Sequence, residues 1–536
     1  MDDFLERVSL ASYQPHPEDR HQLLKLIEGL LAQERYLTKL GQFYGALVDA
    51  ADAARDRQCL LKVVELADTV VQLCTDRDAC FVLYSCSNAW ACLLGFESDE
   101  LDPWRLDHPA LLKQAYYLRA AIQHAGFNEH SAERKAQIYC NLGNALSASG
   151  RWIEAFVQWR LALRQQPILG MARGNLGVGL GRYGGALYDS GHTYVVWVYA
   201  MRELSAAIEG GVGRDGATYQ EAIDHFQAHH DFLQQQISDD LDDAMLHNHT
   251  LGKTKEERRY KQWCLDQGLF LNPLNDLGSI PIASADVFNL PGHNARSGIT
   301  YLAFFNQLKQ EYAFARYCLY QGSQARATHF ADKDVSLSFN CDYAIYSIGL
   351  EQIKCTFRSA YSLLDKIAYF INSYWKLGID ERGVNFRTVW FDLQASKRGG
   401  SGKRQVREVF SSTRNLPLRG LYWLSQDIYS KELSDVASPE AKELDALRNH
   451  LEHKYVKVVD ACHWVGSPSP FNADNLAHVI ERDDLTAKAK LILTLSRSAL
   501  IYLSLAMHHE ESQSRNDSEG LIGSLPVDDY PDDLKV

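Results

Sequence analysis

The segment from Ala136 to Pro167, AQIYCNLGNALSASGRWIEAFVQWRLALRQQP, restricts the fold more than any other part of the chain. Its small and large apolar residues recur at the spacing expected for two packed helices. The residues at the key positions of a 34-residue unit that starts at Ala136 are Leu142, Gly143, Leu146, Ala155, Trp159, Ala162 and Pro167. Small residues let two helices approach closely, and a proline ends a helix. One such pair cannot bury its own apolar face, so several pairs must stack.

This unit resembles the tetratricopeptide repeat. A second unit begins at Gly170, where Asn175-Leu176-Gly177 repeats Asn141-Leu142-Gly143 in step. Upstream, the segments 38–54 and 58–74 read as one degenerate helix pair, and 84–96 with 109–124 read as another. We therefore expect a repeat-like helical array in residues 1–240, strongest over about 20–240, followed by a linking helical region in residues 241–339.

Helical periodicity is strong again in the C-terminal part of the chain. Four segments carry it, at residues 343–378, 418–433, 438–464 and 483–510, and another helix at 298–320 is expected to join them to the array. Four long amphipathic helices predict a four-helix bundle over residues 340–510. Residues 511–536 are polar and acidic, and are predicted to be a disordered tail. The expected fold class is all-α.

The charge of the chain is uneven. Its formal net charge is −13, yet residues 340–500 hold 22 Lys and Arg against 19 Asp and Glu. The overall balance argues against a general nucleic-acid coat, whereas the slightly basic bundle suits a local anionic ligand. The eleven cysteines form no C-x-x-C pair, so a zinc ribbon is not expected and they are interpreted as small buried residues.

The third bundle segment carries an unusual concentration of acid–base groups, in the stretch LRNHLEHKYV. With about 100° of rotation per residue, Arg448 falls at the edge of the apolar stripe around Leu451, while Asn449, Glu452 and His453 fall on the opposite face. Val456 shares this polar face, which suggests contact with a second surface. Arg448 and Glu452 could instead form an ordinary i,i+4 ion pair on a solvated helix.

The run RNHLEH, residues 448–453, resembles the R-x4–6-H signature of the HEPN superfamily (higher eukaryotes and prokaryotes nucleotide-binding). Together with SLLDKIAYFINSYW and LRGLYWLSQD, it is similar to a HEPN branch that accompanies tetratricopeptide repeats in prokaryotic conflict systems. The resemblance implies a ribonuclease in which His453 transfers protons, Arg448 holds phosphate and Asn449 orients the substrate. His450, Glu452 and Lys454 are the candidate helpers.

Two functions are consistent with these patterns. The first is a metal-independent endoribonuclease, a toxin or antiviral effector that is regulated by a protein or peptide on its repeats. The second is a non-catalytic scaffold whose bundle only binds RNA or nucleotide. No cofactor and no metal are expected. Because one helix offers only one His453, we expect a homodimer through the bundle. The N-terminus has no signal-peptide pattern, so a cytoplasmic protein without a membrane segment is expected.

Overall fold

The structure is a computed structural model of the whole chain. It describes residues 16–32, 39–97, 104–213, 218–237, 241–291, 295–338, 344–392, 405–411, 413–431, 443–460, 476–516 and 531–535, with the single residues 102, 433 and 436. The fold is all-α, as expected, with two small two-stranded sheets in the C-terminal part.

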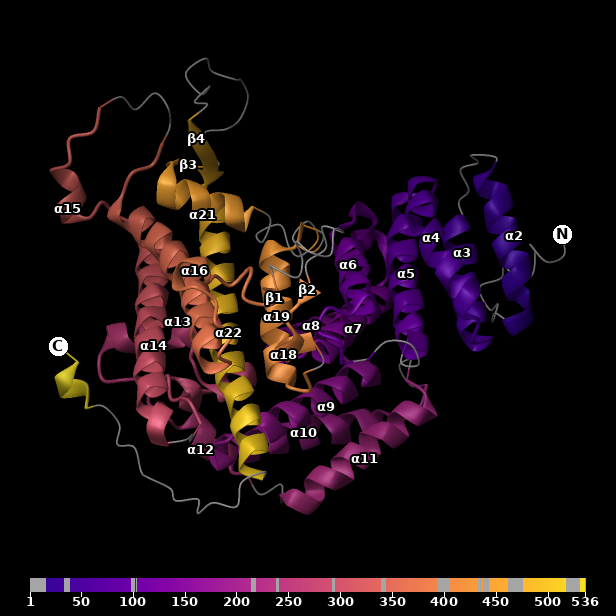
Figure 1. Cartoon of the computed structure of the whole chain (residues 1–536), viewed down its shortest axis with the longest axis horizontal. Helices are drawn as coiled ribbons and strands as arrows, with labels where there is room; N and C mark the ends of the chain where they lie inside the picture. Colours follow the sequence, from indigo (N-terminus) through magenta and orange to yellow (C-terminus); the bar gives the residue numbers. More distant parts are fainter. Residues whose placement is uncertain are drawn as a thin grey trace.

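The N-terminal half is a row of helices, drawn from indigo to magenta in Figure 1. Neighbouring helices along the chain pack against each other from α2 to α11. Their bounds are α2 Arg20–Leu31, α3 Leu40–Ala53, α4 Arg57–Gln72, α5 Asp76–Glu97, α6 Pro109–Gln123, α7 Ala132–Ala148, α8 Trp152–Gln165, α9 Gly170–Ala186, α10 Ser190–Gly210 and α11 Gln220–Gln236. This arrangement is consistent with the predicted repeat-like array.

The predicted close packing of one helix pair is present between α7 and α8. Gly143 on α7 faces Trp159 on α8 so closely that a Cβ atom at Gly143 would lie 2.5 Å from the indole nitrogen. The same indole donates a hydrogen bond of 3.0 Å to Asn144. Helix α7 begins at Ser131, whose hydroxyl accepts from the amide of Arg134, and Pro167 follows the end of α8. The pattern of small and large residues therefore sets this helix pair.

The second half of the chain begins with short helices and continues into a bundle. The short elements are α12 Asp243–His247, α13 Lys255–Asp266, the 3₁₀ turns Pro273–Asp276 and Pro281–Ala283, and α15 Phe330–Lys333. The remaining elements are α14 Ala295–Gln324, α16 Ile348–Tyr374, β1 Phe391–Asp392, β2 Gln405–Val406, α18 Glu408–Ser411, α19 Leu416–Tyr429, α21 Leu444–His453, β3 Tyr455–Val459, β4 Ala477–Glu481 and α22 Arg482–Asn516.

Helix α14 is part of the bundle, although the sequence led us to expect a joining helix. It packs along α16 and also against α22, and α22 in turn packs against α16 and α19. The long helices of the bundle are therefore α14, α16, α19 and α22. Helix α22 also extends to Asn516, beyond the predicted start of the disordered tail at residue 511. Residues 517–530 of that tail lie outside the described residues.

The predicted third helix, 438–464, is wrong over residues 454–460, and its last residues, 461–464, lie outside the described residues. Helix α21 ends at His453, and β3 follows and pairs in parallel with β4, with Val456 opposite His478. The proposed helix start at Ser438 lies outside the described residues. Figure 1 shows α21 lying across the end of the bundle, crosswise to α16 and α22. The β-branched residues of the YVKVV segment suit a strand, and β4 supplies the hydrogen-bonding partner.

Val456 does not lie on an exposed helix face. It is only 8% exposed, and Val458 beside it on β3 is also buried. A continued helix would place Tyr455 within about 40° of Leu451 in the apolar stripe, yet Tyr455 is exposed. Because strand side chains alternate between two faces, the helical wheel fails after His453. Val456 therefore does not offer a contact surface for a second chain.

The array and the bundle are joined by a buried cluster of charged groups. Asp427 on α19 accepts hydrogen bonds of 2.6 and 2.8 Å from the guanidinium of Arg119 on α6, and a further one from Arg151, which precedes α8. All three side chains are at least nine-tenths buried. Although burial opposes the charge, the two arginines lower the pKa of Asp427 to about 2. One carboxylate thus ties two array helices to the bundle.

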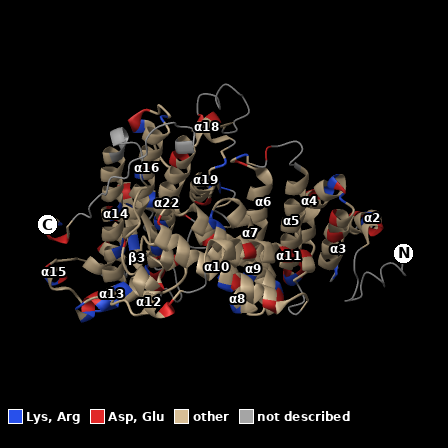
Figure 2. Ribbon diagram, turned by 90° about the horizontal axis from the view of Figure 1, so that it is seen from below, with Lys and Arg blue, Asp and Glu red and all other residues tan. Residues whose placement is uncertain are grey.

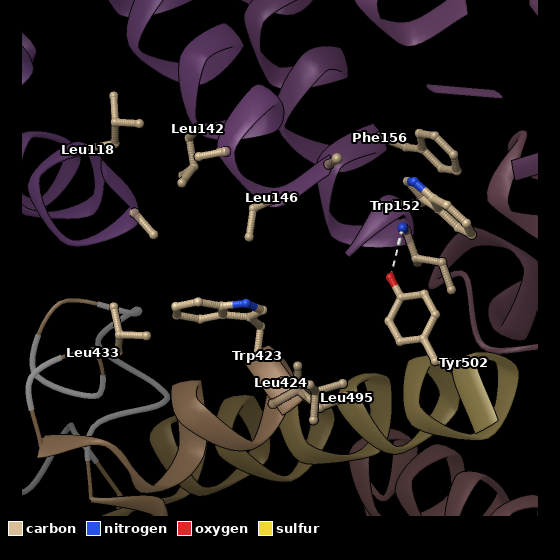
Figure 3. Close-up of a cluster of buried hydrophobic side chains, with 14 of the residues drawn as sticks. Leu118, Leu142, Leu146, Trp152, Phe156, Trp423, Leu424, Leu433, Leu495 and Tyr502 are labelled. Carbon is tan, nitrogen blue, oxygen red and sulfur yellow. Dashed lines mark hydrogen bonds between the residues drawn. The ribbon is translucent and has the colours of Figure 1, made fainter. Parts of the chain in front are cut away.

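Apolar side chains and close backbone contacts complete this interface. Figure 3 shows Leu142, Leu146 and Trp152 of the array facing Trp423 and Tyr502 of the bundle. The Tyr502 hydroxyl accepts a hydrogen bond of 3.0 Å from the amide of Ile153 and donates one of 2.8 Å to Glu154. At Gly150, φ is +81°, and a Cβ atom would lie 2.0 Å from the carbonyl oxygen of Leu416. The two halves therefore pack as one body along this seam.

Among the described residues, two helices are long and apolar enough to cross a membrane by length and composition, within 76–96 and 482–514. In the fold, 56% of the most apolar 18-residue stretch of the first helix is buried, and 83% of that of the second. Both are core helices of the array and of the bundle, and packing against neighbouring helices accounts for their composition.

Candidate functional site

Helix α21 is held in place by three polar side chains of α16. Arg358, Tyr361 and Asp365 are spaced by three and four residues, so they lie along one face of α16. Arg358 donates a hydrogen bond of 2.8 Å to the carbonyl oxygen of Leu451, in the last turn of α21. The hydroxyl of Tyr361 donates one of 3.3 Å to Asp445 in the first turn. Both ends of α21 are thereby fixed to the bundle.

Arg448 lies between these two anchors. Its Nη2 donates a hydrogen bond of 2.8 Å to Asp365, and its guanidinium lies over the Tyr361 ring, 4.6 Å from the ring centroid. Burial works against its charge, but Asp365 together with Tyr361, Tyr429 and Asp445 outweighs burial and raises the pKa of Arg448. The expected alternative partner was Glu452, yet the carboxylate that binds Arg448 belongs to Asp365. The side chain remains 39% exposed, so it is still partly open to solvent.

The other predicted residues on α21 are accessible. Asn449, Glu452, His453 and Lys454 are all exposed, and His453 is the last residue of the helix. Within the described part of the chain, the His453 side chain forms no hydrogen bond or ion pair. The prediction that His453 lies off the bundle core is therefore confirmed. Its imidazole is free to meet a ligand from solvent.

His450 is half-buried and has a partner that the sequence did not indicate. The Nδ1–H of His450 donates a hydrogen bond of 2.7 Å to the carbonyl oxygen of Ala446, since a carbonyl can only accept. The ring of His478, on β4, lies 4.8 Å from the ring of His450, centroid to centroid. Burial, and next the neighbouring His450, lower the pKa of His478. Strand pairing thus brings a second histidine beside α21.

Three residues that shape this site, Asp365, Tyr361 and His478, were not singled out from the sequence. The spacing of Arg358, Tyr361 and Asp365 on one predicted helix is a signal that could have indicated a polar face. His478 carries no such local signal, because it reaches α21 only through the pairing of β3 with β4.

Four cysteines between residues 74 and 92 lie in the array, away from this site. Cys74, Cys80 and Cys86 are buried and Cys92 is half-buried, and burial raises the pKa of both Cys80 and Cys86 to about 12. They pack as small apolar residues, as the sequence suggested. Among the described residues, no group of three or more His, Cys, Asp and Glu is arranged to hold a metal ion.

Charged side chains of both signs are spread over the molecule. Figure 2 shows Lys and Arg interspersed with Asp and Glu along the helices of both halves. For an acidic chain with this distribution, contact with an anionic ligand depends on local groups such as those around α21.

The family of the C-terminal part follows from a comparison with known proteins. Residues 293–510 match the family model described as LA2681-like HEPN. The match begins just before α14, inside the region expected to be a linker, which agrees with the packing of α14 in the bundle. No curated protein and no solved structure matches the chain. The HEPN superfamily includes ribonucleases, so the match is consistent with an RNA-related role for this part of the chain. Residues 293–510 are therefore a HEPN domain of the LA2681-like family.

Proposed function

We propose that the HEPN domain is a metal-independent endoribonuclease whose active site lies on α21. One observation supports this most strongly: α21 presents a solvent-exposed His453 and Asn449 together with a cation, Arg448, that is fixed by the bundle. A surface helix has no structural need for an unpaired imidazole in this position. An active site, in contrast, requires a proton-transfer group open to the substrate and a charge held in place beforehand.

The chemistry needs a proton acceptor, a proton donor and a cation. The 2′-oxygen of a ribose bonds to the adjacent phosphorus as its proton leaves, and the bond from phosphorus to the 5′-oxygen breaks as that oxygen takes up a proton. Histidine suits either transfer near neutral pH. Arg448 can bind the charged phosphate oxygens with its guanidinium group, because its side chain is partly exposed. Asn449, next to it, can orient the substrate by hydrogen bonds.

His453 supplies only one of the two proton-transfer groups in each chain. The second must come from another chain or from another part of the same chain. We propose, as the sequence suggested, a two-fold homodimer that brings two copies of α21 to one cleft. The exposed His453 supports this, whereas Val456 no longer does. Sedimentation or light scattering tests it, and an active monomer would exclude a dimeric site.

We further propose that the array regulates the nuclease, as in a toxin or an antiviral effector. The support is the buried seam around Asp427, through which a protein bound to the array would act on α19 and the bundle. Binding of a regulator to the purified chain, followed by RNA cleavage with and without it, tests this proposal. A regulator that binds the array and leaves cleavage unchanged would contradict it.

The second candidate function is RNA or nucleotide binding without cleavage. It is favoured by the ion pair between Arg448 and Asp365, which neutralises much of the charge that the phosphate would meet. In this case the three α16 contacts only stabilise the helix, and His453 is an ordinary surface residue.

Substitutions at α21 separate the two candidates. For the nuclease, His453→Ala and Arg448→Ala should each lower the cleavage rate by about 10²–10⁴-fold. The control for His453 is His247→Ala, since His247 is also an exposed histidine in the last turn of a short helix, α12. The control for Arg448 is Asp365→Asn, which loosens the same contact but keeps the cation. RNA binding without cleavage by the wild-type protein would favour the second candidate.

A further inference from the structure

The histidines around α21 form a short row that continues onto β4. His450 and His453 are three residues apart on the helix, which places their Cβ atoms roughly 5–6 Å from each other on one side. His450 in turn contacts His478, with 4.8 Å between the ring centroids. His453 is exposed, and His450 and His478 are half-exposed, so the row leads from solvent into the junction of α21 and β4.

Contact between two imidazoles restricts how many protons they carry. Two positive charges this close repel each other, so a proton on one ring disfavours a proton on the other. The groups that act on His478 are His450 and Glu443 from α21, and Lys488 and Asp484 from α22. Lys488 is bound to Asp484 at 2.6 Å, which leaves burial and His450 as the main influences. They lower the pKa of His478, and a neutral imidazole is a proton acceptor.

The hydrogen bond of His450 adds a constraint on its ring. Because Nδ1–H is held by the carbonyl oxygen of Ala446, the ring is kept in one orientation. The ring therefore holds a defined position against His478, which is the property of a residue that positions its neighbour.

We propose that His478 is the second proton-transfer residue of the RNA-cutting site, within the same chain as His453, and that His450 is its positioning residue. This inference rests on the proposed ribonuclease function. His478 takes the proton from the 2′-hydroxyl as the 2′-oxygen bonds to phosphorus. Protonated His453 gives its proton to the 5′-oxygen as the bond from phosphorus to that oxygen breaks. The products are a 2′,3′-cyclic phosphate and a 5′-hydroxyl, and both rings exchange protons with water before the next turnover. Each chain then contributes both imidazoles of a site, and the proposed homodimer would bring two such sites to one cleft.

Single-turnover cleavage of RNA by the full-length chain tests the assignment. His478→Gln should lower the rate by about 10²–10⁴-fold and remove the rise in rate with pH on the acidic side, while RNA binding is retained. The matched control is His229→Gln. His229 also contacts a second histidine, His225, at 4.6 Å between ring centroids, but this pair lies on α11 of the array. The control should cut RNA at the wild-type rate.

The role of His450 has its own readout. In His450→Gln the positive charge that lowers the pKa of His478 is absent, so the pKa of His478 should rise. The acidic limb, which is the rise of the cleavage rate with pH on the acidic side of the profile, should then move to higher pH. Selective ¹⁵N-histidine labelling should show the same upward change in the titration of His478. A purely structural role for His450 would change the rate or the melting temperature without moving this limb. If the acidic limb and the titration of His478 are both unchanged in His450→Gln, His450 is not a positioning residue. This outcome can be read even if His478→Gln fails to fold.

Mixing two inactive variants decides whether the two imidazoles act within one chain. If they do, combining His453→Ala with His478→Gln chains restores no activity. Recovery toward a quarter or half of the wild-type rate would place the imidazoles on different chains and overturn the inference. A wild-type rate for His478→Gln alone would also overturn it, yet would leave the nuclease standing. No cleavage by the wild-type protein would instead remove the proposed function, and this inference with it.

Discussion

Replacement of Asp427 by asparagine tests whether the array and the bundle are held together by buried charge. Asp427 accepts from both Arg119 and Arg151, and the substitution leaves two buried guanidinium groups without their shared counter-charge. Breaking a buried ion pair in this way costs about 3–5 kcal/mol. The pKa of Asp427, about 2 against an ordinary 3.8, leads to a similar magnitude. This lowering of the pKa corresponds to roughly 2.5 kcal/mol.

Urea unfolding followed by circular dichroism measures this effect, with the midpoint compared at several pH values. Because the pKa of Asp427 is lowered in the folded state, its stabilising contribution is present above about pH 4 and is lost as the pH falls toward 2. The variant should therefore unfold at clearly lower urea at pH 7, and the difference should shrink toward pH 3.

A matched control is Asp243→Asn. Asp243 is also bound through both carboxylate oxygens by one arginine, Arg202, at 2.8 and 3.1 Å, but that pair is exposed. Its loss should cost no more than about 1 kcal/mol. The reasoning is refuted if Asp427→Asn unfolds at the wild-type midpoint at pH 7, or if its deficit is as large at pH 3 as at pH 7.

Further substitutions at the seam and on α21 have expected outcomes. Gly150→Ala should destabilise the seam more than Gly268→Ala, since both have positive φ but only Gly150 lies against a neighbouring backbone; equal unfolding midpoints would contradict this. Arg448→Ala and Asp365→Asn should each lower the free energy of unfolding by about 1 kcal/mol, because each breaks the same half-exposed ion pair. The double variant should therefore lose little more than either single variant, and additive losses would show that the two residues act separately. Tyr502→Phe removes the partner of Glu154 and of the Ile153 amide, and should cost about 1–3 kcal/mol in thermal unfolding; an unchanged melting temperature would show that this contact is dispensable.

Much of the fold could be predicted because it rests on local patterns. The spacing of Gly143 and Trp159 indicated a helix pair before any contact was known, and the long apolar stripes of α16 and α22 indicated a bundle. These signals are local, since a helix forms its hydrogen bonds within its own segment. The role of α14 was missed because its apolar stripe does not reveal which neighbour it packs against.

The end of α21 could not be predicted in the same way. Residues 455–459 fit a helical stripe and a short strand about equally well, and the choice depends on β4, which follows well after them in the chain. For the same reason the helical wheel placed His453 correctly but misplaced Val456 and Tyr455. Asp365 reaches Arg448, and His478 reaches His450, only through tertiary packing. The sequence motif therefore indicated the exposed residues of the site but not their half-buried partners.

Cleavage of one RNA in the presence of EDTA, with analysis of the new ends, tests the central claim most directly. The 2′-O-methylated form of the same RNA serves as the matched substrate, since it lacks the attacking hydroxyl. If the domain is a metal-independent ribonuclease, the wild-type protein cuts only the unmodified RNA, without added metal. It then leaves 2′,3′-cyclic phosphate or 3′-phosphate ends together with 5′-hydroxyl ends. Cleavage that requires Mg²⁺ and leaves 3′-hydroxyl ends, or equal cleavage of the methylated RNA, would contradict this claim.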